Sequence, residues 1–154
     1  STRVVYEQVA LDFFAKQILS NDTLLKGYRA HYDGMVDERV MTMPLTIYIH
    51  HRNDSLIQQA AAQANSNDST FWANNRRPSF QLNVTPPIKR KLHKRYGRRS
   101  KVARPMVLQH LLVGDKVYVT IKTHLGSGAY GMEYYITMNK AGEVVDFDEI
   151  SFVY

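Results

Sequence analysis

The chain has 154 residues, 44% of them hydrophobic and 11% aromatic, which is enough for one ordinary core and predicts a single domain over residues 1–154. It carries a formal net charge of +6 and has no Cys, so disulfides, thiolate catalysis and Cys-ligated zinc are excluded. No apolar run approaches the roughly 18 to 20 residues of a membrane-spanning helix, and we expect a soluble protein. The start at Ser1, without Met, favours an exported protein, periplasmic or cell-surface, although a cytoplasmic chain fits as well.

The first 34 residues predict a helical hairpin. Apolar residues recur at helical spacing from Val4 to Leu19, and Ser20-Asn21-Asp22 supplies a stop and the cap of a second helix. Leu24, Leu25, Tyr28 and Tyr32 mark one face of that second helix, which Asp33-Gly34 ends. We expect this hairpin to bury Phe13, Phe14 and Leu25 against a sheet.

The middle of the chain predicts shorter elements. A β-branched and aromatic run at 45–49 predicts a strand, a helix is expected from Asn53 to Ala64, and a short strand is expected from Phe80 to Val84. Pro86-Pro87 can begin a basic helix, in which Ile88, Leu92 and Tyr96 form a thin apolar stripe.

The C-terminal third predicts an antiparallel meander. Four strands are expected, at Met106 to Val113, Lys116 to Leu125, Tyr130 to Met138 and Val144 to Val153. Gly114-Asp115 and residues 139–142 are typical hairpin turns, and Val117, Val119 and Ile121 alternate with polar residues. Helices first and a sheet last make the predicted fold class α+β, with N-terminal helices packed on a curved, mainly antiparallel sheet.

This layout resembles the nuclear transport factor 2-like (cystatin-like) superfamily. The resemblance lies in the helical opening with Phe13-Phe14, in Tyr28-x-x-x-Tyr32-Asp33-Gly34, and in the last two strands, around residues 131–136 and 142–147. It implies a curved sheet around helices and a cone-shaped pocket used for small ligands, catalysis or partner binding. The basic segment at 76–104 departs from the usual pattern, and no catalytic motif of the superfamily can be matched residue by residue.

Charge is strongly segregated along the chain. From Ser69 to Gly114 there are eleven Lys or Arg and no Asp or Glu, whereas the remainder holds nine Lys or Arg against fourteen acids. Such a block attracts anions such as phosphates or sulfates, although it can also be a solvated face or pair with the chain's own acids. The predicted anion-binding residues are Lys89, Arg90, Lys94, Arg95, Arg98 and Arg99.

Histidines offer a weaker signal for catalysis. His50-His51 follows a strand, so the two side chains point to opposite faces and make a poor metal chelate. His110 and His124 fall on predicted neighbouring strands and, with Asp146 or Glu133, could form an acid–base set in a pocket. Ordinary, partly exposed sheet histidines are the alternative.

Aromatic residues gather on the last hairpin, where Tyr134 and Tyr135 must face opposite sides of the sheet. Core packing explains such a cluster, and a ligand cavity is the alternative. The predicted pocket residues are Tyr130, Tyr134, Tyr135 and Phe147.

These observations favour a non-enzymatic binding or interaction domain with an aromatic pocket and a basic segment for an anionic partner or small molecule. A small lyase or isomerase using His110, His124 or Asp146 is one alternative, and a nucleic-acid-binding protein is another. No metal or cofactor is predicted, and oligomerisation stays open.

Overall fold

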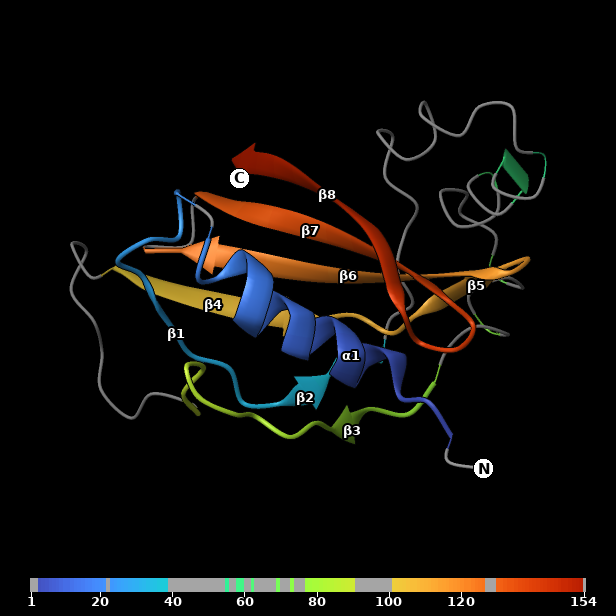
Figure 1. The fold of residues 1–154 in the computed structure, drawn as a ribbon, viewed down its shortest axis with the longest axis horizontal. Coiled ribbons are helices and arrows are strands. Elements are labelled where there is room, and N and C mark those ends of the chain that lie inside the picture. The colour runs from blue at the N-terminus through green and yellow to red at the C-terminus, as the bar shows by residue number, and fades with distance from the viewer. Residues whose placement is uncertain are drawn as a thin grey trace.

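The fold is α+β, as the sequence predicts, and the structure is a computed structural model (Figure 1). It describes residues 3–21, 23–38, 77–90, 101–126 and 130–153, together with six single residues between 55 and 73. Among the described residues, no helix is long and apolar enough to cross a membrane.

The described fold contains two sheets, one helix with both ends described, and single helical residues between 55 and 73. Helix α1 (Tyr6–Phe13) continues into a π-helical turn, η1 (Phe14–Ile18). The strands are β1 (Arg29–Ala30), β2 (Met35–Val36), β3 (Phe80–Gln81), β4 (Val102–Val107), β5 (Leu111–Val113), β6 (Lys116–Leu125), β7 (Tyr130–Asn139) and β8 (Val144–Val153).

The main sheet has the order β1-β4-β6-β7-β8, and β5 also pairs with β6. It is antiparallel except for β1, which runs parallel to β4. Strands β2 and β3 form a separate antiparallel pair. The sheet is thus dominated by the C-terminal strands, and the predicted boundaries of β6 and β8 match those of the structure.

The predicted strand at Met106 to Val113 is two strands in the structure. Both β4 and β5 pair with β6, through different stretches of it, and the chain between them is held by a 3.0 Å bond from the Leu108 N–H to the Thr120 carbonyl. Strand β4 also begins earlier than predicted, before Pro105. The carbonyl of Ala103 points toward β1, and so does the nitrogen of Pro105, two residues later. Because Pro105 lies beyond the end of the β1–β4 pairing, the N–H that proline lacks removes no hydrogen bond from the sheet.

Helix α1 lies across one face of the sheet (Figure 1). Phe14 is fully buried there, and its ring centroid lies 5.6 Å from that of Tyr134 on β7. Leu25 is also buried in this core, whereas Phe13 packs at its margin. The prediction that Phe14 and Leu25 are buried is therefore confirmed. Gln8 on α1 holds residues 80–84 in place by exchanging two hydrogen bonds with the backbone of Asn83.

The predicted second helix of the hairpin is wrong. Gly27 takes a φ of +89°, a left-handed conformation that suits glycine, and the chain then enters β1 instead of continuing a helix. The backbone N–H of Arg29 donates to Lys101 and that of His31 donates to Ala103, so sheet bonds replace the helical ones. Tyr28 and Tyr32 therefore belong to an extended segment.

The predicted start of a basic helix at Pro86 is also wrong for residues 86–90. Lys89 forms a parallel bridge with His31, because its N–H donates to the Ala30 carbonyl and its own carbonyl accepts from the Tyr32 N–H. Ile88 is buried in the core beside it. The strand predicted at Phe80 to Val84 is confirmed in its first two residues, as β3. Within the helix predicted at 53–64, the described residues Ser55, Gln58, Gln59 and Ala62 are helical. The other residues of that helix, the strand at 45–49 and the rest of the basic helix lie outside the described residues.

Candidate functional site

A pocket of about 330 Å³ opens beside β1, at the edge of the main sheet. Its walls are the turn that follows η1, strand β1 itself, and the segment around Pro87. The described residues that line it are Leu19, Ser20, Leu25, Lys26, Gly27, Tyr28, Arg29, Ala30, Pro87 and Lys89. The volume lies at the lower end of the range of small-ligand sites.

The described lining is apolar inside and cationic at its rim. Leu25 and Ala30 are buried, whereas Lys26, Arg29 and Lys89 are exposed. Three of the described lining residues are thus cations, and none of them is acidic. Since charges at a low-dielectric wall are screened less than charges in open water, these cations produce a positive potential in the pocket.

The local sequence explains why these cations meet. Strand β1 lies between two parallel neighbours, Lys89 on one side and the start of β4 on the other. Lys89 pairs with His31, and the Lys101 carbonyl accepts from the Arg29 N–H. Lys89 and Lys101, which both belong to the predicted basic segment, therefore flank β1 on its two sides, roughly 10 Å apart across the sheet. Residues 91–100 between them lie outside the described residues.

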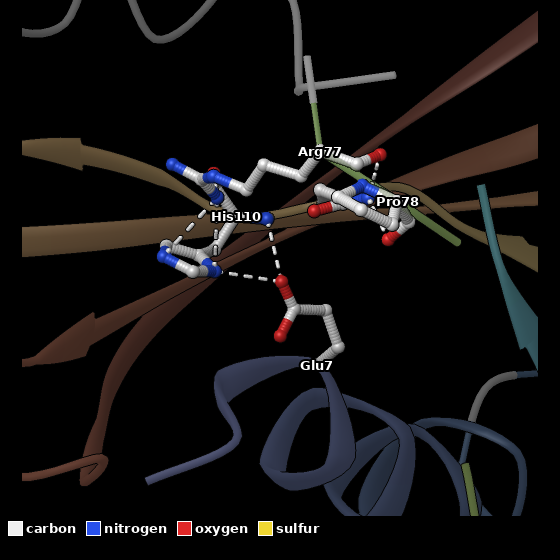
Figure 2. A network of polar contacts seen from close by, with 5 residues as sticks. Glu7, Arg77, Pro78 and His110 are labelled. Atoms are coloured by element: carbon white, nitrogen blue, oxygen red, sulfur yellow. Dashed lines mark hydrogen bonds and ion pairs between the residues drawn. The ribbon is translucent and has the colours of Figure 1, made fainter. Parts of the chain in front are cut away.

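A second polar cluster joins α1 to the chain between β4 and β5 (Figure 2). The Glu7 carboxylate Oε1 accepts two hydrogen bonds from His110, one from its backbone N–H at 2.8 Å and one from its ring Nδ1 at 2.7 Å. Because a carboxylate only accepts, Nδ1 carries a proton in this arrangement. The Glu7 side chain is 3% exposed and that of His110 is 24% exposed, so the ion pair is mostly shielded from water.

The guanidinium group of Arg77 lies against the His110 ring (Figure 2). Its Nη1 donates to the His110 carbonyl at 2.9 Å and lies 3.3 Å from each ring nitrogen. Equal distances place it beside the carbon between the two nitrogens, which is poor hydrogen-bond geometry for either. Buried Gln109 donates to the carbonyls of Arg77 and Pro78 and fixes this segment.

The environment of Glu7 sets its ionisation. Burial would raise the pKa of the Glu7 carboxyl, but the hydrogen bonds from the His110 side chain and backbone, with the charge of the imidazole, outweigh burial and lower it. Glu7 is therefore ionised at neutral pH and orients His110. A His–carboxylate pair of this kind can relay a proton. Together with Arg77 it also joins α1, the chain at His110 and the segment before β3.

The structure places two of the six predicted anion-binding residues, Lys89 and Arg90, both exposed at the sheet edge. Lys94, Arg95, Arg98 and Arg99 lie outside the described residues, as do His50 and His51.

The structure does not bring together the predicted acid–base set. His124 pairs with Gly131, whereas Leu111, next to His110, pairs with Tyr118 six residues away along β6, a separation of roughly 20 Å. His124 instead lies edge-on to the Phe152 ring at 5.6 Å. Asp146 lies on the outer strand β8 and accepts a hydrogen bond from the Phe147 N–H at 2.9 Å.

Glu133 has two partners outside the predicted acid–base set. It lies 3.5 Å from the Lys122 ammonium and accepts a hydrogen bond from the Tyr135 hydroxyl.

The four predicted aromatic pocket residues lie on two faces. Tyr134 is fully buried in the core against Phe14, whereas Tyr135 is buried on the opposite face. Phe147 is 42% exposed and meets Phe13 with ring centroids 5.4 Å apart, and Tyr130 is exposed. None of the four lines the pocket beside β1.

Sequence reasoning missed Glu7, Lys26 and Arg29. A signal for Glu7 was present, because Glu7, Leu11, Phe14 and Ile18 are spaced so that they share one helical face. A carboxylate in an apolar stripe indicates a buried acid with a partner. Lys26 and Arg29 gave no such signal, because their role depends on the turn at Gly27, which the helical pattern concealed.

In comparisons with known proteins, no family model matches this chain, and no curated protein and no solved structure gives a significant match. The resemblance to the nuclear transport factor 2-like superfamily therefore stays a prediction.

Proposed function

We propose that this protein is a non-enzymatic binding domain that holds an anionic partner at the edge formed by β1 and Lys89. The observation that carries the proposal is the pocket beside β1, whose described lining includes three cations and no acid. Lys89 and Lys101, two described residues of the basic segment, lie beside β1, which links the charge block of the sequence to the pocket.

The chemistry of the pocket favours one charged unit of a longer anion. Lys26, Arg29 and Lys89 can pair with phosphate or sulfate oxygens. Tyr28 and Pro87 can make apolar contacts with the part of the ligand to which the phosphate or sulfate group is attached. Further units could pair with the exposed cations Arg90 and Lys101. We infer that the partner is a phosphate- or sulfate-bearing polymer, because such a polymer releases counterions when several cations engage it.

The test uses inorganic polyphosphate and heparin as probes, with binding measured over a series of salt concentrations. The wild-type protein is expected to bind both, with affinity falling steeply as salt rises. Lys26→Glu with Lys89→Glu should weaken binding at least about 10-fold and reduce the slope of log affinity against log salt.

Lys116→Glu with Lys140→Glu is the matched control. It changes the net charge equally but acts at the other end of the sheet, where Lys116 pairs with Asn139. This control should keep affinity within about 3-fold, because long-range charge effects are screened by salt. Equal losses in the two double variants would mean that only net charge matters, and the proposal would fail.

A second candidate function is acid–base catalysis, and the Glu7–His110 pair is the observation that favours it. It requires Nε2 of His110 to be open to a substrate. Acylation of His110 by diethyl pyrocarbonate, faster than that of His124 and slowed by Glu7→Gln, would support it. An unreactive His110 would exclude it.

Nucleic acid is a special case of a phosphate polymer. Tighter binding of single-stranded oligonucleotides than of polyphosphate at equal salt would favour it, because base stacking adds to the charge contacts.

A further inference from the structure

Strand β8 ends the main sheet on the side opposite to β1 (Figure 1). It is ten residues long, and no strand in the described part of the chain pairs with its outer side. Near its start, the Phe147 N–H donates to the side chain of Asp146 at 2.9 Å. Such an edge offers a row of backbone groups to another chain.

The chemistry of β8 is acidic and partly apolar. The last fourteen residues contain no Lys, Arg or His, but they hold the acids Glu143, Asp146, Asp148 and Glu149. Val145 is 51% exposed and Val153 is 78% exposed, so apolar side chains lie among these acids. A partner that fits this edge is therefore cationic and extended.

The opposite edge of the same sheet has the complementary chemistry. There Lys89 bridges to His31 beyond β1, and Arg90 next to it is exposed. The backbone at Lys89 is extended, since its N–H and carbonyl both take part in sheet bonds with β1. One molecule thus carries an acidic strand at one edge of its sheet and two exposed cations, Lys89 and Arg90, at the other.

We propose that β8 docks the basic edge of a second copy of this chain, which makes a head-to-tail assembly. This rests on the proposed function, because it names one anionic partner of the basic edge. Pairing of β8 with β8 would place Asp146 and Asp148 of the two copies close to like charges, which opposes that arrangement. Pairing of unlike edges is heterologous, so it produces chains or rings instead of a closed two-fold dimer.

Sedimentation velocity of three proteins tests the inference. They are the wild type, an acidic-edge variant with Asp146→Lys and Asp148→Lys, and a basic-edge variant with Lys89→Glu and Arg90→Glu. The wild type should associate at about 10 mM salt and dissociate at about 1 M, because the Debye length falls from ~30 Å to ~3 Å. Each variant alone should associate at least about 100-fold more weakly, because the two edges then no longer carry opposite charges.

An equimolar mixture of the two variants is the decisive sample. One variant keeps only the basic edge of the wild type and the other keeps only its acidic edge, so the mixture should associate as neither does alone. A wild type that is monomeric at low salt would overturn the inference, and so would a mixture that stays monomeric. Lys116→Glu with Lys140→Glu, the matched control, should associate like the wild type.

Polyphosphate binding by the acidic-edge variant separates the two proposals. This variant keeps the whole pocket beside β1, so it should bind polyphosphate at least as tightly as the wild type. If the wild type binds polyphosphate but does not self-associate, only the docking of β8 fails. If it does neither, both proposals fail.

Discussion

Replacement of Glu7 by Gln should destabilise the fold in a pH-dependent way. The carboxylate accepts hydrogen bonds from both the backbone and the ring of His110, and its side chain is 3% exposed. The amide of the substituted side chain would keep an oxygen for the backbone N–H but would lose the charge, and hydrogen bonds to charged groups contribute about 1.5 to 3 kcal/mol. We expect a loss of about 1 to 2 kcal/mol for Glu7→Gln at pH 7, and about 3 to 5 kcal/mol for Glu7→Ala, which leaves a buried donor unpaired.

The pKa of Glu7 gives the sign of the pH dependence. His110 lowers the folded-state pKa below the ordinary value of 4.5, so the folded protein releases this proton more readily than the unfolded chain. The stabilisation is therefore complete well above pH 4.5 and disappears as the pH falls through the folded pKa. Urea unfolding of the wild type and Glu7→Gln should differ at pH 7 and converge as the pH falls below the folded pKa of Glu7.

Glu143→Gln is the control for this measurement, because Glu143 is exposed on the turn before β8. Its effect should stay within about 0.5 kcal/mol at either pH. A Glu7→Gln protein as stable as this control at pH 7 would refute the reasoning, and so would a difference that does not change with pH.

Three further predictions concern the core and the outer face of the sheet. Phe14→Ala should cost about 3 to 5 kcal/mol in urea unfolding, because Phe14 is fully buried, and an unchanged midpoint would contradict its packing on β7. Gly131→Ala should cost at least about 1 to 3 kcal/mol, because the added methyl group would strike both the Phe152 ring and the backbone carbonyl of Thr123, and Phe152→Ala in the same chain should recover only the part due to the ring. Burial, reinforced by Glu133, raises the pKa of Tyr135 above its ordinary value of 10, so stability should fall as the pH rises beyond 10. Tyr135→Phe should flatten that alkaline decline in a thermal unfolding series, and an equally steep decline would show that Tyr135 does not cause it.

The C-terminal sheet could be predicted from the sequence because its information is local. Val117, Val119 and Ile121 alternate with polar residues, and Gly114 and Gly142 take positive φ values in the turns. Strands β5, β6, β7 and β8 each pair with their neighbour in sequence, so turns and alternation together determine their register. Tyr134 and Tyr135 lie on opposite faces for the same reason.

The candidate site could not be predicted in this way because it depends on distant pairings. Tyr28 and Tyr32 have helical spacing, yet the bonds from β1 to residues 89 and 101–103 hold them in an extended segment. Local propensity is weak compared with such tertiary bonds. Glu7 and His110 are 103 residues apart, and only the packing of α1 on the sheet brings them together. The basic block predicts an anion site but not its position. The pocket beside β1 depends on the turn at Gly27, which the sequence pattern did not predict.

Hydrogen–deuterium exchange with and without excess polyphosphate tests the central claim most directly, because it locates the bound anion on the chain. We expect slower exchange in Lys26–Ala30 and Pro87–Lys89, the segments that line the pocket, and no change in α1. The same measurement on the Lys26→Glu, Lys89→Glu protein should show no such slowing. Unchanged exchange in both segments, with slowing confined to α1 or β8, would contradict the assignment of the anion site to the edge beside β1.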